Sequence, residues 1–78
     1  MFMNYEKIQS ECYRMEDYFN SEDIEYVQVY IKTWTTEISV DYENFENIPE
    51  EELIQVRYRG QYLRIEYQEI LRLSFSVG

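Results

Sequence analysis

The apolar residues of this chain change their spacing once, near residue 20, and this change constrains the fold more than any other feature. Before it, they recur at steps of three and four residues, which places them on one face of a helix. These residues are Tyr5, Ile8, Cys12, Met15 and Phe19. Asn4 stands at a suitable N-cap position. The pattern predicts a helix from about Asn4 to Phe19 whose apolar stripe seals one face of a sheet.

After residue 20 the apolar residues alternate, as they do in strands. Residues 24–32 are β-branched and aromatic with apolar side chains on both faces, which favours a central strand. Residues 34–43 alternate more strictly. One face carries Trp34, Ile38, Val40 and Tyr42, and the other carries Thr35, Glu37, Ser39, Asp41 and Glu43. This segment is predicted to be a half-buried strand with an acidic solvent face.

A hairpin is predicted where residues 53–59 and 61–67 flank Gly60. Glycine is preferred at the first central position of a type II′ turn, so the expected turn is Gly60-Gln61. That register pairs apolar with apolar residues: Tyr58 with Leu63, Val56 with Ile65, and Ile54 with Tyr67. It also sets Arg57 opposite Arg64, a like-charge pair.

Two further segments complete the predicted fold. Residues 44–52 are expected to form a loop with one helical turn after Pro49. Residues 70–77 alternate again and form either a fifth strand or a bent continuation of the fourth. We therefore expect a single α+β domain over residues 1–78, with one N-terminal helix packed on a four- to five-stranded antiparallel sheet.

The residue types needed for common active sites are absent. The chain has one cysteine, Cys12, no histidine and only two glycines, which excludes an internal disulfide, common zinc sites and Ser–His–Asp relays. The acids from Asp41 onward fit a calcium loop poorly, because Phe45 and Glu46 replace a ligand and the turn glycine. We expect no enzymatic activity, no cofactor and no metal.

The charge is strongly acidic, with 16 acids against 7 bases and a net charge of −9. Direct binding to nucleic acid or to an anionic membrane surface is therefore disfavoured. No apolar stretch approaches the roughly 20 residues of a membrane span, and the N-terminus lacks the pattern of a signal peptide. We expect a cytoplasmic protein.

The acids are unevenly distributed, since 14 of the 16 lie in residues 1–54 with only 3 of the 7 bases. Neighbouring acids on one strand face are about 6.8 Å apart, comparable to the phosphates of a DNA strand. Nine tyrosines add contact area suited to interfaces. The predicted partner-binding residues are Glu37, Asp41, Glu43, Glu50, Glu51, Glu52 and the exposed Tyr13. Alternatively, the acids only keep a small protein soluble and the tyrosines are ordinary strand residues.

These features predict a non-enzymatic acidic binding module whose partner is a larger basic protein, itself a nucleic-acid binder. In size and charge the chain is analogous to small phage-encoded inhibitors, including anti-CRISPR and anti-restriction proteins that mimic DNA, although no residue pattern carries the analogy. The alternative is a homo-oligomeric structural or accessory protein that assembles through sheet edges, and a homodimer stays open.

Overall fold

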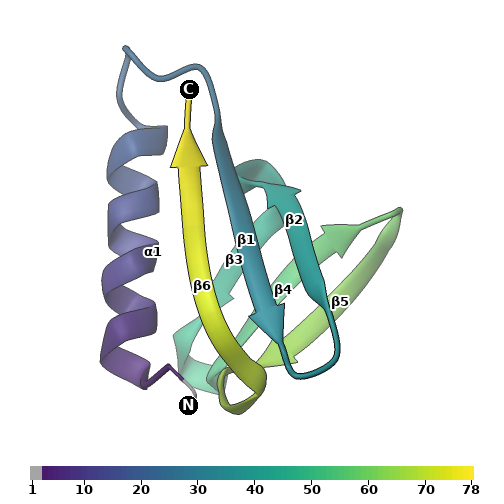
Figure 1. Cartoon of the computed structure of the whole chain (residues 1–78). Helices are drawn as coiled ribbons and strands as arrows, with labels where there is room; N and C mark the ends of the chain where they lie inside the picture. Colours follow the sequence, from purple (N-terminus) through teal and green to yellow (C-terminus); the bar gives the residue numbers. More distant parts are fainter. Residues whose placement is uncertain (1–2) are drawn as a thin grey trace.

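The structure, a computed structural model that describes residues 3–78, contains one helix and two three-stranded antiparallel sheets (Figure 1). The helix, α1, spans Tyr5–Phe19. The first sheet has the order β2-β1-β6, with β1 at Val27–Thr33, β2 at Glu37–Asp41 and β6 at Ile70–Val77. The second has the order β3-β4-β5, with β3 at Phe45–Ile48, β4 at Leu53–Tyr58 and β5 at Gln61–Glu66. The α+β class is confirmed, but the single sheet of four to five strands is wrong.

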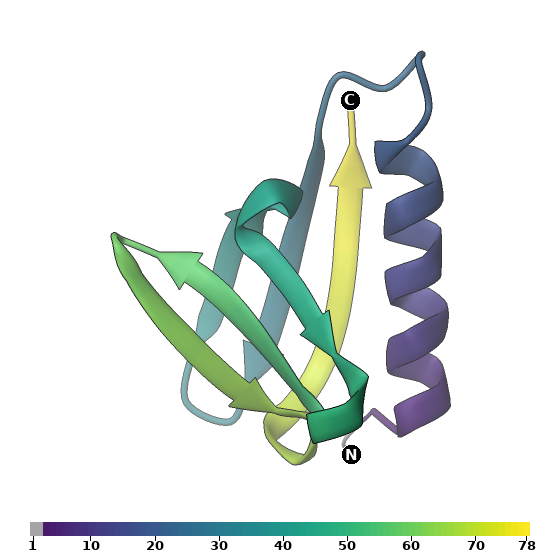
Figure 2. The same cartoon turned by 180° about the vertical axis from the view of Figure 1, so that it is seen from behind.

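The helix forms where the apolar period predicts it. The side chain of Asn4 accepts a hydrogen bond from the backbone N–H of Lys7 at 2.8 Å, which caps the first turn. α1 lies beside β6 at one side of the molecule (Figures 1 and 2), so only part of its stripe reaches the core. Ile8 and Met15 are fully buried, whereas Phe19 is 41% exposed. The expectation that Phe19 helps to seal a sheet face is therefore wrong.

The division into two sheets results from a turn within the segment predicted as one long strand. β2 ends at Asp41, and a 3₁₀ turn, η1 (Tyr42–Asn44), leads the chain into β3 of the second sheet. The prediction that Glu43 shares a strand face with Asp41 is therefore wrong. β3 itself falls in the predicted loop. The single turn expected after Pro49 is present as η2 (Pro49–Glu51).

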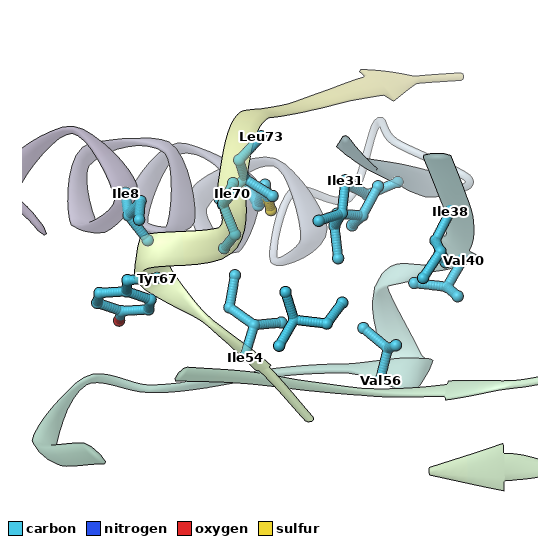
Figure 3. Packing of buried hydrophobic residues seen from close by; sticks show 13 residues of the cluster. Ile8, Ile31, Ile38, Val40, Ile54, Val56, Tyr67, Ile70 and Leu73 are labelled. Atoms are coloured by element: carbon cyan, nitrogen blue, oxygen red, sulfur yellow. The ribbon is translucent and has the colours of Figure 1, made fainter. Parts of the chain in front are cut away.

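The core lies between the two sheets and is completed by α1 (Figure 3). Val27, Val29 and Ile31 point into it from β1, which is central in its sheet, as predicted. The other buried members are Ile8, Met15, Ile38, Val40, Ile54, Val56, Ile65, Tyr67, Ile70 and Leu73. Trp34 does not join them: it lies in the turn before β2 and is 67% exposed, contrary to its predicted inner position.

The hairpin between β4 and β5 closes with a two-residue turn at Arg59-Gly60 rather than Gly60-Gln61. Both turn residues have positive φ, 52° and 78°, as a type I′ turn requires. Ile54 therefore pairs with Ile65, not with Tyr67. A shift of two residues keeps every side chain on its predicted face.

This register removes the predicted contact between two arginines. Arg57 faces Tyr62, and Arg64 faces Gln55.

Residues 70–77 form a separate strand, which settles one alternative left open by the sequence. A 3₁₀ turn, η3 (Tyr67–Glu69), follows β5 and turns the chain toward the first sheet. β6 then pairs with β1 in antiparallel register, from Val27 opposite Val77 to Thr33 opposite Ile70.

Candidate functional site

Among the predicted partner-binding residues, Glu37 lies apart from the others. It sits at the start of β2, opposite Lys32 of β1, and its carboxylate is 3.6 Å from the guanidinium of Arg72. Both side chains are more than half exposed, so this ion pair is weak. Even so, Glu37 lies beside the basic residues Lys32 and Arg72, so the surface around it is not purely acidic.

The three consecutive glutamates lie at the opposite end of β3 from η1 (Figure 2). Glu50 is exposed in η2, and the carboxylate of Glu51 is 3.0 Å from the guanidinium of Arg64. Glu52 follows η2 with a left-handed backbone, φ 52°. The structure therefore does not join these glutamates to Asp41 and Glu43.

A different set of acids gathers around η1. Three surface depressions adjoin one another there, and each of Tyr42, Glu43, Phe45 and Glu46 lines two of them. The carboxylates that line them are Glu16, Glu25, Asp41, Glu43 and Glu46. We call these five acids, together with the aromatic residues Tyr13, Phe19, Tyr42 and Phe45 between them, the corner surface.

The corner surface contains three of the predicted residues, Tyr13, Asp41 and Glu43. Tyr13 is 68% exposed, as its position opposite the helix stripe predicted. Glu16, Glu25 and Glu46 were missed by the sequence interpretation. Glu16 lies three residues after Tyr13 on α1, so helix spacing could have pointed to it, whereas Glu46 depends on the unrecognised strand β3.

The five carboxylates of the corner surface are exposed and have no cationic partner. The ion pairs within residues 3–78 use Glu11, Glu37 and Glu51, so no corner carboxylate lies within 4.0 Å of a lysine or arginine nitrogen. Among the described residues, Arg57 is the one basic residue in the lining of these depressions, and it lines only the depression that also contains Glu43 and Glu46. Five like charges close together favour the approach of a positively charged group.

Three of the aromatic residues of the corner surface, Phe19, Tyr42 and Phe45, form a row of neighbouring rings. The ring centroids of Phe19 and Tyr42 are 4.7 Å apart, and those of Tyr42 and Phe45 are 5.9 Å apart. The pKa of Tyr42 is raised above its ordinary value, mainly by burial and to a smaller extent by the charge of Glu16. The phenol of Tyr42 is therefore neutral at physiological pH, and the carboxylates supply the negative charge.

Metal binding and membrane insertion were also considered for the part of the chain that the structure describes. No group of three or more His, Cys, Asp or Glu side chains within residues 3–78 is arranged to hold a metal ion. α1 is too short and too polar to cross a membrane. The geometry favours recognition of a cationic partner by carboxylates and aromatic rings.

Comparison with known proteins yields no match to a protein-family model, to a curated protein or to a solved structure.

Proposed function

We propose that this chain is a non-enzymatic binding protein that docks its corner surface on a larger basic protein. The observation that carries the proposal is the set of five exposed carboxylates without cationic partners, interleaved with aromatic side chains. Tyrosine and phenylalanine supply apolar contact area at interfaces. Complementary charge steers the partner and accelerates association.

The proposed partner is a protein whose basic surface normally binds nucleic acid. Such surfaces neutralise phosphates with lysine and arginine, and the corner carboxylates would take the place of those phosphates. The chain would then act as an inhibitor that mimics DNA, as the anti-CRISPR and anti-restriction proteins to which it is analogous in size and charge do. The sequence alone had predicted an acidic face along the strand at residues 34–43, whereas the surface proposed here is centred on η1.

The first experiment is an affinity pull-down followed by mass spectrometry, with the captured protein then purified for direct binding measurements. The test variant is Asp41→Lys with Glu43→Lys. Both residues are exposed, so circular dichroism should show an intact fold. We expect affinity to fall by at least about tenfold, and DNA or RNA to compete for the same site.

A matched control is Glu6→Lys with Glu50→Lys, which changes the net charge equally. Glu6 lies in the first turn of α1 and Glu50 in η2, both away from η1 (Figure 2). This variant should keep most of the affinity. Equal losses in the two variants, or no loss in the first, would exclude the corner surface as the docking site.

A second candidate function is assembly of this chain with itself through a sheet edge. β5 is one of the two edge strands of the sheet β3-β4-β5, and such an edge can pair with another strand. Sedimentation velocity over a wide concentration range distinguishes the two functions. Docking on a basic partner predicts a constant monomer mass, whereas self-assembly predicts a mass that rises with concentration.

A further inference from the structure

A groove of about 390 Å³ separates α1 from β3 and its flanking turns. Its helix wall consists of Gln9, Cys12, Tyr13 and Glu16, which share one face because of their helical spacing. The opposite wall consists of Tyr42, Phe45, Glu46, Asn47 and Pro49. Its volume lies at the low end of the range of roughly 300–1,000 Å³ typical of ligand pockets.

The floor of the groove is apolar and uncharged. Cys12, Tyr42 and Phe45 are half-buried and pack against the core cluster. The pKa of the Cys12 thiol is raised to about 12, mainly by burial and to a smaller extent by the charge of Glu11. The thiol is therefore protonated at physiological pH, and the floor offers a ligand apolar contact and the neutral hydroxyl of Tyr42, but no charge.

The amide groups in the groove are already used by a closed ring of hydrogen bonds. Gln9 Nε2 donates to the Tyr67 hydroxyl at 2.7 Å, and this hydroxyl donates to Asn47 Oδ1 at 2.5 Å. Asn47 Nδ2 donates back to Gln9 Oε1 at 2.8 Å. Each amide therefore has both a donor and an acceptor engaged within the ring. A ligand that bound to either amide would compete with these hydrogen bonds.

The groups left to bind a ligand are the acceptors at the lip. Glu16 and Glu46 are exposed on opposite walls, and neither has a cation within 4.0 Å among residues 3–78. No lysine or arginine lines the groove. A complementary ligand therefore carries a positive charge and several N–H donors on an apolar stem.

We propose that the groove between α1 and β3 receives an arginine side chain of the basic partner, with Glu16 and Glu46 as its counter-charges. This inference rests on the proposed function and names the chemistry recognised at part of the corner surface. Arginine fits better than lysine, because its planar guanidinium has five donors, can bridge two carboxylates and stacks on aromatic rings. Its methylene stem would lie along the apolar floor.

The direct test uses three capped tripeptides, Ac-Gly-X-Gly-NH₂, in which X is arginine, lysine or citrulline. Citrulline keeps the shape of arginine but carries no charge. In ¹⁵N-labelled protein, the arginine peptide should cause saturable shifts of the Cys12, Tyr13 and Glu46 backbone amides. The lysine peptide should bind more weakly, and the citrulline peptide should not saturate.

The role of the two carboxylates is tested by the double variant Glu16→Gln with Glu46→Gln. We expect about tenfold weaker binding of the arginine peptide, as two partly exposed ion pairs would contribute. The control is Glu22→Gln with Asp23→Asn, which alters the net charge equally in the loop after α1 and should bind normally. Spectra of both variants without peptide verify folding.

Several outcomes would overturn the inference. These are no saturable shift with the arginine peptide, equal binding of the lysine peptide, and equal affinity in the two double variants. Failure here is distinguishable from failure of the proposed function. If Asp41→Lys with Glu43→Lys abolishes partner binding while Glu16→Gln with Glu46→Gln does not, the docking surface stands and the arginine groove is wrong. If the arginine peptide binds but no basic protein does, the groove recognises arginine and the proposed docking function is wrong.

Discussion

Ile8 and Met15 hold α1 against the core, while the residues at both ends of its apolar stripe remain partly in water. Tyr5 and Phe19 are 46% and 41% exposed, although they have the same helical phase as the buried pair. Phe19 packs against Tyr42 at a centroid distance of 4.7 Å, which belongs to the corner surface more than to the core. Burial, and not residue size, therefore decides which side chain stabilises the helix docking.

Substitution of Met15 tests this difference. Met15→Ala should lower the free energy of unfolding by about 2–5 kcal/mol, because it removes a fully buried side chain and leaves a cavity. Phe19→Ala should cost less, about 1 kcal/mol, since the ring is already partly hydrated. Urea denaturation of both variants gives the comparison. A larger loss for Phe19→Ala would show that the helix is oriented differently.

Cys12 makes stability depend on pH in the alkaline range. The thiol pKa is raised from 9.0 to about 12 in the folded protein, first by burial. Above pH 9 the unfolded chain therefore loses a proton that the folded protein keeps. The stability present below that pH falls as the pH rises toward 12.

Cys12→Ala isolates this contribution. The difference in unfolding free energy between the native protein and Cys12→Ala should shrink by about 1 kcal/mol between pH 9 and about pH 10. Tyr42 and Tyr67, whose pKa values are raised chiefly by burial and to a smaller extent by the charge of Cys12, are present in both proteins, so most of their contribution cancels in this difference. Urea denaturation at each pH measures the difference, and a constant value would contradict the raised thiol pKa.

Among the structural elements, the β4–β5 turn shows how backbone conformation decides register. Gly60 has φ 78°, a left-handed conformation that disfavours any L side chain. A Cβ atom at this position would meet nothing within 4 Å, so the penalty of a substitution is purely conformational.

Gly60→Ala should therefore destabilise the protein by about 1 kcal/mol. A synthetic protein with D-alanine at position 60 is the matched control, because D-residues prefer positive φ. It should be as stable as the native protein or slightly more so. Thermal unfolding followed by circular dichroism measures both, and equal destabilisation by the two alanines would argue against the positive φ.

Local sequence patterns predicted α1 and the inward faces of β1, β2, β4 and β5, because helix and strand periods depend on neighbouring residues only. The two-sheet arrangement was not predictable in this way. It depends on η1, where Tyr42–Asn44 lacks glycine and proline, and on β3, whose polar Glu46 and Asn47 interrupt its apolar residues. The hairpin register depended on Arg59 adopting φ 52°, which arginine rarely does.

At the scale of the whole molecule, the candidate site was also predictable only in part from the sequence. Composition predicted an acidic surface with exposed tyrosine, and Tyr13, Asp41 and Glu43 lie on it. The fold then placed Glu37 beside Arg72 and Glu51 beside Arg64, and it brought Glu16 and Glu46 to the groove instead. Which acids gather depends on contacts between distant segments, and those follow from the turn at η1.

The net charge of −9 should make the folded protein sensitive to salt. The three ion pairs within residues 3–78 are partly or largely exposed, so each adds little to stability. Repulsion between acids should therefore dominate, and it is screened once the Debye length shortens to about 10 Å near 0.1 M salt. Raising NaCl from about 10 mM to about 300 mM should increase Tm by about 4 °C.

The control for this salt prediction is the same comparison near the isoelectric point. The sequence pI is about 4.3, and at that pH most of the repulsion is gone, so added NaCl should change Tm little. Differential scanning calorimetry at pH 7 and near pH 4.3 supplies both measurements. A fall in Tm with salt at pH 7 would mean that specific ion pairs outweigh the repulsion. Such a fall would contradict the premise that repulsion between unpaired acids dominates, and it would weaken the proposal that the corner carboxylates await a basic partner.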